Sequence, residues 1–464
     1  MRQWWVMGVA IWPAAALAQT GQGAQSGQTA QGDVQVTIYN NGVSLVQDAR
    51  TLTLAQGRSR QEFPDVSAQI RPETVTLSGS GVGIVEQNFD YDLLSPDKLM
   101  EKAVGRVVTI VRTNPATGAE TREQARVLAA NGGIVLQIGN RIEVLRDDGL
   151  PVRVVFDEVP ENLRARPTLS VTVEAAQAGP VQTRLSYLTP GLGWTSDYVA
   201  LFDEKAGAID VQGWVTLTNN TGTTFARAET LLVAGNVGGA ANRFAALGDE
   251  AAIEQAGTET GTRQRLGDFY LYPLAERTTL ANAQQKQVSF LDVKATAARK
   301  AYEFSNGWLG GNDVPRSAAT AIKFSTSRAG GLGDQLPAGT VRVYMRDARG
   351  DPQFIGENRI PHTPMGSSMS IRTGEAFDVK VKVLVAERTR LARGRWRTRM
   401  AYTLTNARDA PVTVDLAQDG LWGDVKVVDQ SLSGERVSAD RIEWKVPVQA
   451  NGATDLTATF DTRY

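Results

Sequence analysis

The sequence predicts an all-β protein built from several domains, with very little helix. In many short runs apolar residues occupy every second position, and turn residues separate the runs. The clearest run is Ala208–Thr218, in which Val211 and Val215 alternate with polar residues before the turn residues Asn219–Gly222. Alternation with a period of two is the signal of a half-buried strand. Hydrophobic residues make up 42% and charged residues 21% of the chain, as in ordinary globular proteins.

The N-terminal residues have the pattern of a secretory signal peptide. Arg2 precedes an apolar run, Trp4–Ala15, and Ala16-Leu17-Ala18 resembles a cleavage site. The run is shorter than the ~20 apolar residues that a transmembrane helix needs. We therefore expect a signal peptide at 1–18, a periplasmic or extracellular location, and no transmembrane span in the mature chain. Residues 19–32, rich in Gln, Gly, Ser and Ala, are predicted to be a disordered linker.

An N-terminal β domain is predicted at 33–165. It begins with a hairpin, because Asn41-Gly42 between alternating runs is a strong signal for a tight turn. Closely spaced strand patterns predict a small β-barrel insert at about 104–146. One short helix is predicted just before it, at Ser95–Val104, with Ser95 as its N-terminal cap.

Two further β domains are predicted. The central domain at 166–286 contains a stretch at 238–265 that is rich in Gly, Ala, Thr and Glu. This stretch is expected to be a mobile loop, since it has few large apolar groups to offset the entropy of ordering. The C-terminal domain at 287–464 has alternating strands at sandwich-like spacing, for example Phe377–Val385, and we predict an immunoglobulin-like β-sandwich there.

Two groups of short motifs follow one another between about Arg166 and the C-terminus. The first group comprises Gly193-Trp194-Thr195 with Tyr198, and Gly213-Trp214-Val215 with Asn219-Asn220-Thr221. The second comprises Leu336–Tyr344, Phe354-Ile355-Gly356-Glu357, Ile360-Pro361-His362-Thr363-Pro364 and Ala376-Phe377-Asp378-Val379. In these motifs the chain resembles an uncharacterised bacterial DUF family that includes the mucoidy inhibitor A proteins. The family has no agreed activity, so the resemblance implies no catalytic residues, and its named member implies control of surface polysaccharide. Relatives often carry a coiled-coil insert, whereas this chain has no sustained heptads.

The candidates for catalysis are few. His362 is the only histidine and would have to be the base of a Ser-His-Asp triad. No G-x-S-x-G motif accompanies it, and Pro361 and Pro364 favour a structural turn. Ser95-Pro96-Asp97-Lys98 has the S-x-x-K spacing but lacks K-T-G and S-D-N partners, and helix capping accounts for Ser95. We therefore expect no enzyme and no catalytic residue.

No cofactor or metal is expected. The chain has no cysteine, which excludes disulfides and thiolate metal sites. The acidic pairs Asp90 with Asp92 and Asp147 with Asp148 lack the calcium-loop pattern. A formal net charge of -1 argues against a nucleic-acid partner, which requires a basic excess.

One row of side chains is a candidate binding site. Arg393, Arg395, Arg397 and Arg399 alternate along a predicted strand and could hold an anionic polymer. The alternative is a solvated strand face whose charges discourage edge-to-edge pairing, and the sequence favours it. Exposed tryptophans on a sandwich could stack on sugar rings, although most tryptophans are expected in the core.

The leading hypothesis is a secreted, non-enzymatic protein that binds or scaffolds a component of the cell envelope, either a polysaccharide or a protein. The signal-like N-terminus, the missing catalytic motifs and the family resemblance support it. The alternative is a carboxylate-dependent hydrolase acting on envelope polysaccharide. A deep cleft flanked by two acids would favour the hydrolase.

Overall fold

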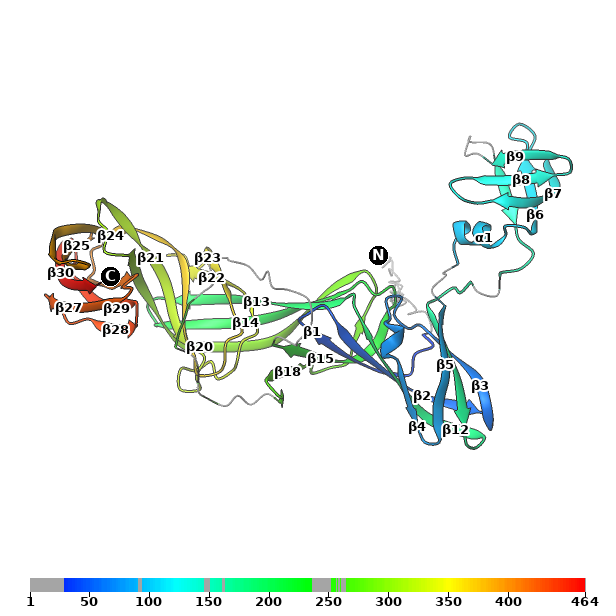
Figure 1. Ribbon diagram of the computed structural model, residues 1–464, viewed down its shortest axis with the longest axis horizontal. Coiled ribbons are helices and arrows are strands. Elements are labelled where there is room, and N and C mark those ends of the chain that lie inside the picture. The colour runs from blue at the N-terminus through cyan, green and yellow to red at the C-terminus, as the bar shows by residue number, and fades with distance from the viewer. Residues whose placement is uncertain are drawn as a thin grey trace, which may run out of the picture.

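The computed structural model describes residues 29–90, 94–145, 151–160, 163–235, 252–255, 257, 259 and 264–463. Strands make up 67% of it and helix 2%, which confirms the predicted all-β class. The strands surround four hydrophobic cores (Figure 1). Within the described ranges, no helix is long and apolar enough to cross a membrane. The predicted signal peptide at 1–18 lies outside the described residues.

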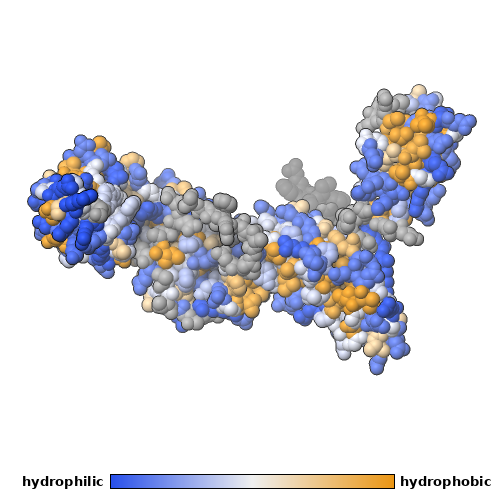
Figure 2. All heavy atoms as spheres, viewed as in Figure 1, coloured by the Kyte–Doolittle hydropathy of each residue, from blue (hydrophilic) through white to orange (hydrophobic). Residues whose placement is uncertain are grey.

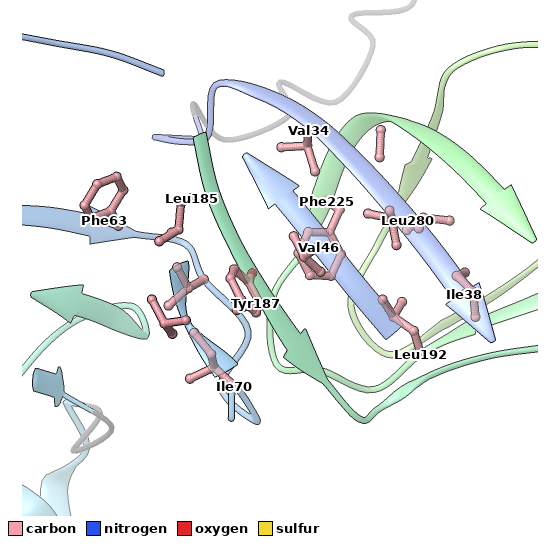
Figure 3. Close-up of a cluster of buried hydrophobic side chains, with 14 of the residues drawn as sticks. Val34, Ile38, Val46, Phe63, Ile70, Leu185, Tyr187, Leu192, Phe225 and Leu280 are labelled. Atoms are coloured by element: carbon pink, nitrogen blue, oxygen red, sulfur yellow. The ribbon is translucent and has the colours of Figure 1, made fainter. Parts of the chain in front are cut away.

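Two sheets pack face to face around the first core. The larger has the order β17 (Arg265–Leu266), β18 (Phe269–Pro273), β15 (Phe225–Ala234), β1 (Asp33–Tyr39), β2 (Ser44–Leu54), β12 (Gly179–Thr189) and β4 (Thr76–Gly79), with β19 (Thr278–Leu280) beside β15. The smaller has the order β3 (Gly57–Pro64), β11 (Thr168–Ala175) and β5 (Val82–Asp90), and a short 3-10 helix, η1 (Pro72–Thr74), precedes β4. Figure 3 shows Val46, Tyr187 and Phe225 in this core, all of them buried.

The first core combines distant parts of the chain. The hairpin predicted at Asn41-Gly42 is confirmed, with β1 antiparallel to β2 and Gly42 at a φ of 75°. Strand β1 also pairs in parallel with β15, and β2 pairs with β12. The domain boundary predicted between residues 165 and 166 therefore runs through one continuous sheet.

The end of the predicted linker is ordered. The backbone N–H of Ala30 donates to the Asp65 carboxylate at 2.7 Å, and that of Gly32 donates to Asp48 at 2.8 Å. Two charge-assisted hydrogen bonds from the backbone offset part of the ordering cost that the composition alone suggests. The prediction of disorder is therefore wrong for residues 29–32, and residues 19–28 lie outside the described ranges.

A small sheet follows helix α1 (Pro96–Lys102). The predicted cap is confirmed, because the Ser95 hydroxyl accepts from the Lys98 backbone N–H at 3.2 Å. The sheet has the order β10 (Val152–Val155), β6 (Val107–Thr113), β7 (Glu120–Ala129), β8 (Ile134–Ile138) and β9 (Arg141–Leu145), every pair antiparallel. Ile110, Val127 and Leu136 fill its own core against Met100 of the helix. The sheet extends to Val155, beyond the predicted range of 104–146.

A third core lies inside a strongly curled sheet. Its strands follow the order β23 (Pro352–Ile360), β22 (Gly339–Arg346), β13 (Leu192–Asp203), β14 (Ala208–Asn219), β20 (Gln284–Gly307), β21 (Asn312–Ser325) and β24 (Ser368–Ala392). Strands β23 and β24 approach so closely that a Cβ on Gly356 would lie 2.2 Å from the Thr373 carbonyl oxygen. Tyr198, Phe202 and Ile322 fill the interior.

Part of the predicted mobile loop at 238–265 is docked on this sheet. Strand β16 (Ala252–Gln255) pairs with β24, and the Gly257 N–H donates to the Ser367 hydroxyl at 2.9 Å. Pairing with a strand edge satisfies backbone groups irrespective of side-chain size, so composition did not reveal it. The prediction of a mobile loop is wrong for Ala252–Gln255, while residues 236–251 lie outside the described ranges.

The C-terminal strands form the fourth core. On one side lie the second half of β24, then β25 (Arg395–Asn406), β30 (Gly452–Arg463) and β27 (Asp424–Gln430). On the other lie the end of β20, then β26 (Val412–Asp419), β29 (Arg441–Val448) and β28 (Glu435–Ser438). Tyr402, Trp444 and Phe460 are fully buried between them.

Long strands connect successive cores. Strand β13 contributes Trp194 to the first core and Tyr198 to the third, and β24 contributes Ile371 to the third and Val383 to the fourth. Strand β20 runs for 24 residues and crosses the predicted boundary between residues 286 and 287. Because a shared strand cannot bend freely, the three cores form an extended body with the C-terminal sandwich at one end (Figure 1).

Candidate functional site

The site lies at the free end of the C-terminal sandwich, where several strand ends meet. Arg395 at the start of β25 pairs with Arg463 at the end of β30, and Arg463 pairs in turn with Asp424 at the start of β27. Strands β24 and β25 join there in a hairpin that we call the basic hairpin, residues Arg388–Arg399. Figure 2 shows a strongly hydrophilic surface at this end of the molecule.

The structure places three of the four predicted arginines on one strand face. Arg395, Arg397 and Arg399 are exposed along β25, while Thr398 and Met400 between and beyond them are buried. Arg393 is not part of this row: it lies in the hairpin turn, which closes through Gly394 at a φ of 70°. The predicted row of four is therefore a row of three with one further cation at its end.

Two arginines that the sequence argument missed join the group from β24. The Arg388 side chain donates to the Thr398 hydroxyl at 3.2 Å and to the Leu309 carbonyl oxygen. The Arg390 guanidinium lies over the Trp396 ring, 5.9 Å from its centroid. Arg388 and Arg390 stand opposite Thr398 and Trp396 in the register, so they lie on the other face of the hairpin from the row. The basic hairpin thus carries six arginines within twelve residues. The pairing of β24 with β25 brings the six arginines into one hairpin. Because they also lie within twelve residues of one another, the sequence alone could have pointed to this cluster.

Most of this positive charge is not neutralised. Arg397 forms a two-pronged ion pair with Asp461, at 2.7 Å and 2.9 Å, and hydrogen bonding to Arg397 lowers the pKa of Asp461. Within the described part of the chain, no other arginine of the basic hairpin takes part in an ion pair. Glu387 stands opposite Arg399 in the strand register but accepts from Thr389 at 2.9 Å. The hairpin therefore keeps a net positive charge, which Asp461 offsets in part by its ion pair with Arg397 and its electrostatic interaction with Arg395.

An aromatic pair lies beside the hairpin. The Trp422 side chain is 70% exposed, and its ring centroid lies 6.0 Å from that of Trp308. Arg388 links the loop of Trp308 to the hairpin through its bond to the Leu309 carbonyl. Of the six tryptophans in the described ranges, only Trp194 and Trp444 are buried, so the expectation that most lie fully in the core is wrong.

The backbone holds the aromatic pair in place. Trp308 has a φ of 64°, and its N–H donates to the Asp419 carbonyl oxygen at 2.8 Å. A Cβ on Gly420 would lie 2.9 Å from the Trp308 nitrogen, so the close approach requires glycine. The Gln418 and Asn306 amides both donate to the Trp308 carbonyl oxygen, at 2.8 Å and 2.9 Å. Because the Trp308 backbone is held in this way, Trp308 loses little conformational entropy when a ligand binds.

The acids expected of a hydrolase are arranged differently. Glu303 and Asp415 stand opposite each other on β20 and β26, and the Lys323 ammonium lies 2.9 Å from both. Burial opposes ionisation of Glu303, but hydrogen bonds from Ser370, Lys323 and Arg372 outweigh it and lower its pKa. A carboxyl held ionised in this way is a poor general acid. The cluster instead ties together four strands of the large sheet.

His362 occupies a turn, and the structure gives it two partners. Its Nδ1 accepts from the Ala338 backbone N–H at 3.1 Å, and its Nε2 lies 3.2 Å from the Asn40 amide nitrogen. Asn40 belongs to the β1–β2 hairpin, so the ring links the first core to the curled sheet. Burial lowers the pKa of His362.

We expect the stability of the protein to fall as the pH drops below about 6.5, the ordinary pKa of histidine. Because burial lowers the pKa of His362 in the folded state, the unfolded chain binds more protons in this range. Stability is therefore lost as the pH falls toward the folded-state pKa. Melting temperatures from pH 8 to pH 5 would show this, and a His362→Gln variant should depend less on pH. Parallel curves for the two proteins would contradict the assignment.

The described residues form no candidate metal site, and the comparisons with known proteins point to no further site. Over the described ranges, no three His, Cys, Asp or Glu residues gather where they could hold a metal ion. Asp92, Asp147 and Asp148 lie outside these ranges. No protein-family model matches the chain, and no curated protein matches it significantly. The basic hairpin and the aromatic pair are thus assigned from their own chemistry.

Proposed function

We propose that this protein is an exported, non-enzymatic component of the cell envelope that binds an acidic polysaccharide at the end of its C-terminal sandwich. The observation that carries the proposal is the basic hairpin, with six arginines of which one is ion-paired, beside an exposed tryptophan. The sequence-based resemblance to proteins linked with surface polysaccharide is consistent with this.

The spacing of the charges suits a polymer better than a small ligand. Same-face residues on a strand lie ~6.6–7 Å apart, so Arg395, Arg397 and Arg399 span ~13 Å, and Arg393 in the turn lies at the end of this row. Guanidinium groups bind carboxylate and phosphate oxygens in a two-pronged geometry. The faces of Trp308 and Trp422 offer flat apolar surface for sugar rings between the anionic groups.

The remainder of the molecule is suited to a supporting role. It is built around four hydrophobic cores, and shared strands connect three of them into one extended body. The best-placed carboxylates, Glu303 and Asp415, are engaged by Lys323. A rigid, extended body with a cationic end can hold a polymer at that end, away from the rest of the molecule.

Retention of the mature protein on immobilised polygalacturonate, compared with a neutral dextran of similar length, tests this proposal. We expect retention on the acidic polymer alone, falling steeply with salt because exposed charges are screened within ~8 Å at physiological ionic strength. Equal retention on both polymers, or on neither, would refute acidic-polysaccharide binding.

Replacing Trp422 with Ala should weaken binding to polygalacturonate by about 3- to 10-fold, since an aromatic contact contributes on the order of 1 kcal/mol. The same change should leave binding to inorganic polyphosphate nearly unaltered, because that polymer has no rings to stack. The ring is 70% exposed, so the melting temperature should not change. Titration calorimetry with both polymers measures the difference. An equal loss for both would remove Trp422 from the proposed site.

A further inference from the structure

The small sheet has a free edge with apolar side chains on its outer face. Strand β9 pairs with β8 and, among the described strands, with no other. Ile142 is 69% exposed and Val144 54%, and Val107 on β6 is 50% exposed. Figure 2 shows an apolar area over the strands of this sheet. An unprotected edge of this kind is a template for a further strand.

The backbone of this edge is oriented toward an added strand. Strands β8 and β9 are joined by the two-residue turn Gly139-Asn140, so Ile138 and Arg141 form the closing pair. In such a hairpin the closing residues exchange both hydrogen bonds, and neighbouring pairs alternate. The N–H and C=O of Ile142 and Val144 therefore point away from β8, on the side where none of the described strands lies.

We propose that β9 pairs antiparallel with β9 of a second copy of this chain, with Ile142 on the two-fold axis. Any interface of two-fold symmetry must be complementary to itself. Within one chain Arg141 already pairs with Glu123 and Glu143, at 2.9 Å and 2.7 Å, and Glu143 also pairs with Arg112. In this register each Arg141 also stands opposite Glu143 of the partner subunit, which extends that network across the axis, and the two Ile142 side chains meet on the apolar face. Opposite charges in facing positions stabilise a pair of strands.

The neighbouring registers of the two β9 strands are less stable than the one centred on Ile142. A slip of one residue turns the apolar face of one copy onto the charged face of the other. A slip of two residues places Glu143 on the axis, so that two carboxylates face each other, which is destabilising. Among these three registers, charge and facial pattern together favour the one centred on Ile142. The basic hairpin lies on a different part of the chain and plays no part in this contact.

A cysteine at the axis tests the register directly. The chain has no cysteine, so Ile142→Cys introduces a single thiol. In a hydrogen-bonded antiparallel pair, facing Cα atoms lie ~5.5 Å apart, within disulfide range. We expect rapid formation of a disulfide-linked dimer under mild oxidation. Val107→Cys is the control, because it lies on the same face but about 14 Å from β9 across three strand spacings.

Charge reversal tests the same pairing in solution. Arg141→Glu and Glu143→Arg should each be monomeric by light scattering, since like charges then face each other across the axis. An equimolar mixture of the two variants should recover the dimer, because every facing pair in the mixed dimer is opposite in charge. Damage to the fold could not be repaired by mixing. Monomeric wild-type protein, or disulfide formation by Ile142→Cys no faster than by Val107→Cys, would overturn the proposal.

Discussion

Replacing Lys323 with Ala should lower the free energy of unfolding by about 3–5 kcal/mol, as removal of one partner from a buried ion pair does. The Lys323 side chain is 11% exposed and lies 2.9 Å from both Glu303 and Asp415, which are equally buried. Without the ammonium, two carboxylates face each other across β20 and β26 with one charge fewer to compensate them. Arg372 and Ser370 still reach Glu303, but Asp415 keeps only Arg299 at 3.9 Å.

Urea unfolding followed by tryptophan fluorescence measures this effect. Lys294→Ala is the matched control, because that lysine is 56% exposed and pairs with the exposed Asp292. It should change stability by no more than about 0.5 kcal/mol. If Lys323→Ala is no more destabilising than the control, the cluster does not hold the sheet together. Glu303 and Asp415 would then be candidates for the two acids of a hydrolase, and the protein should be tested for hydrolytic activity.

Replacing Arg393, Arg395 and Arg399 with Gln together should weaken polygalacturonate binding by roughly 10- to 100-fold, if each exposed charge contributes up to about 1 kcal/mol. These three cations take part in none of the ion pairs among the described residues, so their charge is available to a ligand. The remaining binding should depend less on salt, because fewer charges are neutralised on association.

A second triple variant controls for net charge. Arg58, Arg122 and Arg349 are exposed and lie outside the C-terminal sandwich, and their replacement with Gln removes the same charge. Binding titrations should show near wild-type affinity for this control, and both triple variants should melt close to the wild-type protein. Equal losses of affinity in the two variants would mean that binding follows overall charge and not the basic hairpin.

Local patterns in the sequence predict much of the fold. Alternation predicts β14, with Val211 and Val215 on its buried face, and a serine before Pro96 predicts the cap of α1. These signals work because side-chain direction along a strand and capping at a helix start are properties of a few neighbouring residues.

Local patterns do not predict which distant segments of the chain pair with one another. The boundary expected at 165/166 is crossed by the pairing of β1 with β15, and nothing near β1 encodes its partner. The docking of β16 on β24 relies on backbone hydrogen bonds that composition does not report.

The candidate site was predictable in part for the same reason. The alternation of Arg395, Arg397 and Arg399 is local, and the sequence reveals it. Compensation of Arg397 by Asp461 depends on the register of β25 against β30, 64 residues away. The meeting of Trp308 with Trp422 depends on the ends of β20 and β26 lying side by side. A sequence pattern can suggest a charged row, but only the sheet shows which of its charges remain free.

Amide hydrogen exchange with and without polygalacturonate tests the central claim most directly, because it locates the bound polymer on the chain. Binding at the proposed site should slow exchange in three segments at the end of the sandwich: 308–311, 393–399 and 420–424. Exchange in the small sheet and around the first core should stay unchanged. Slower exchange elsewhere, with these three segments unaffected, would contradict the assignment of the basic hairpin and the aromatic pair as the binding site.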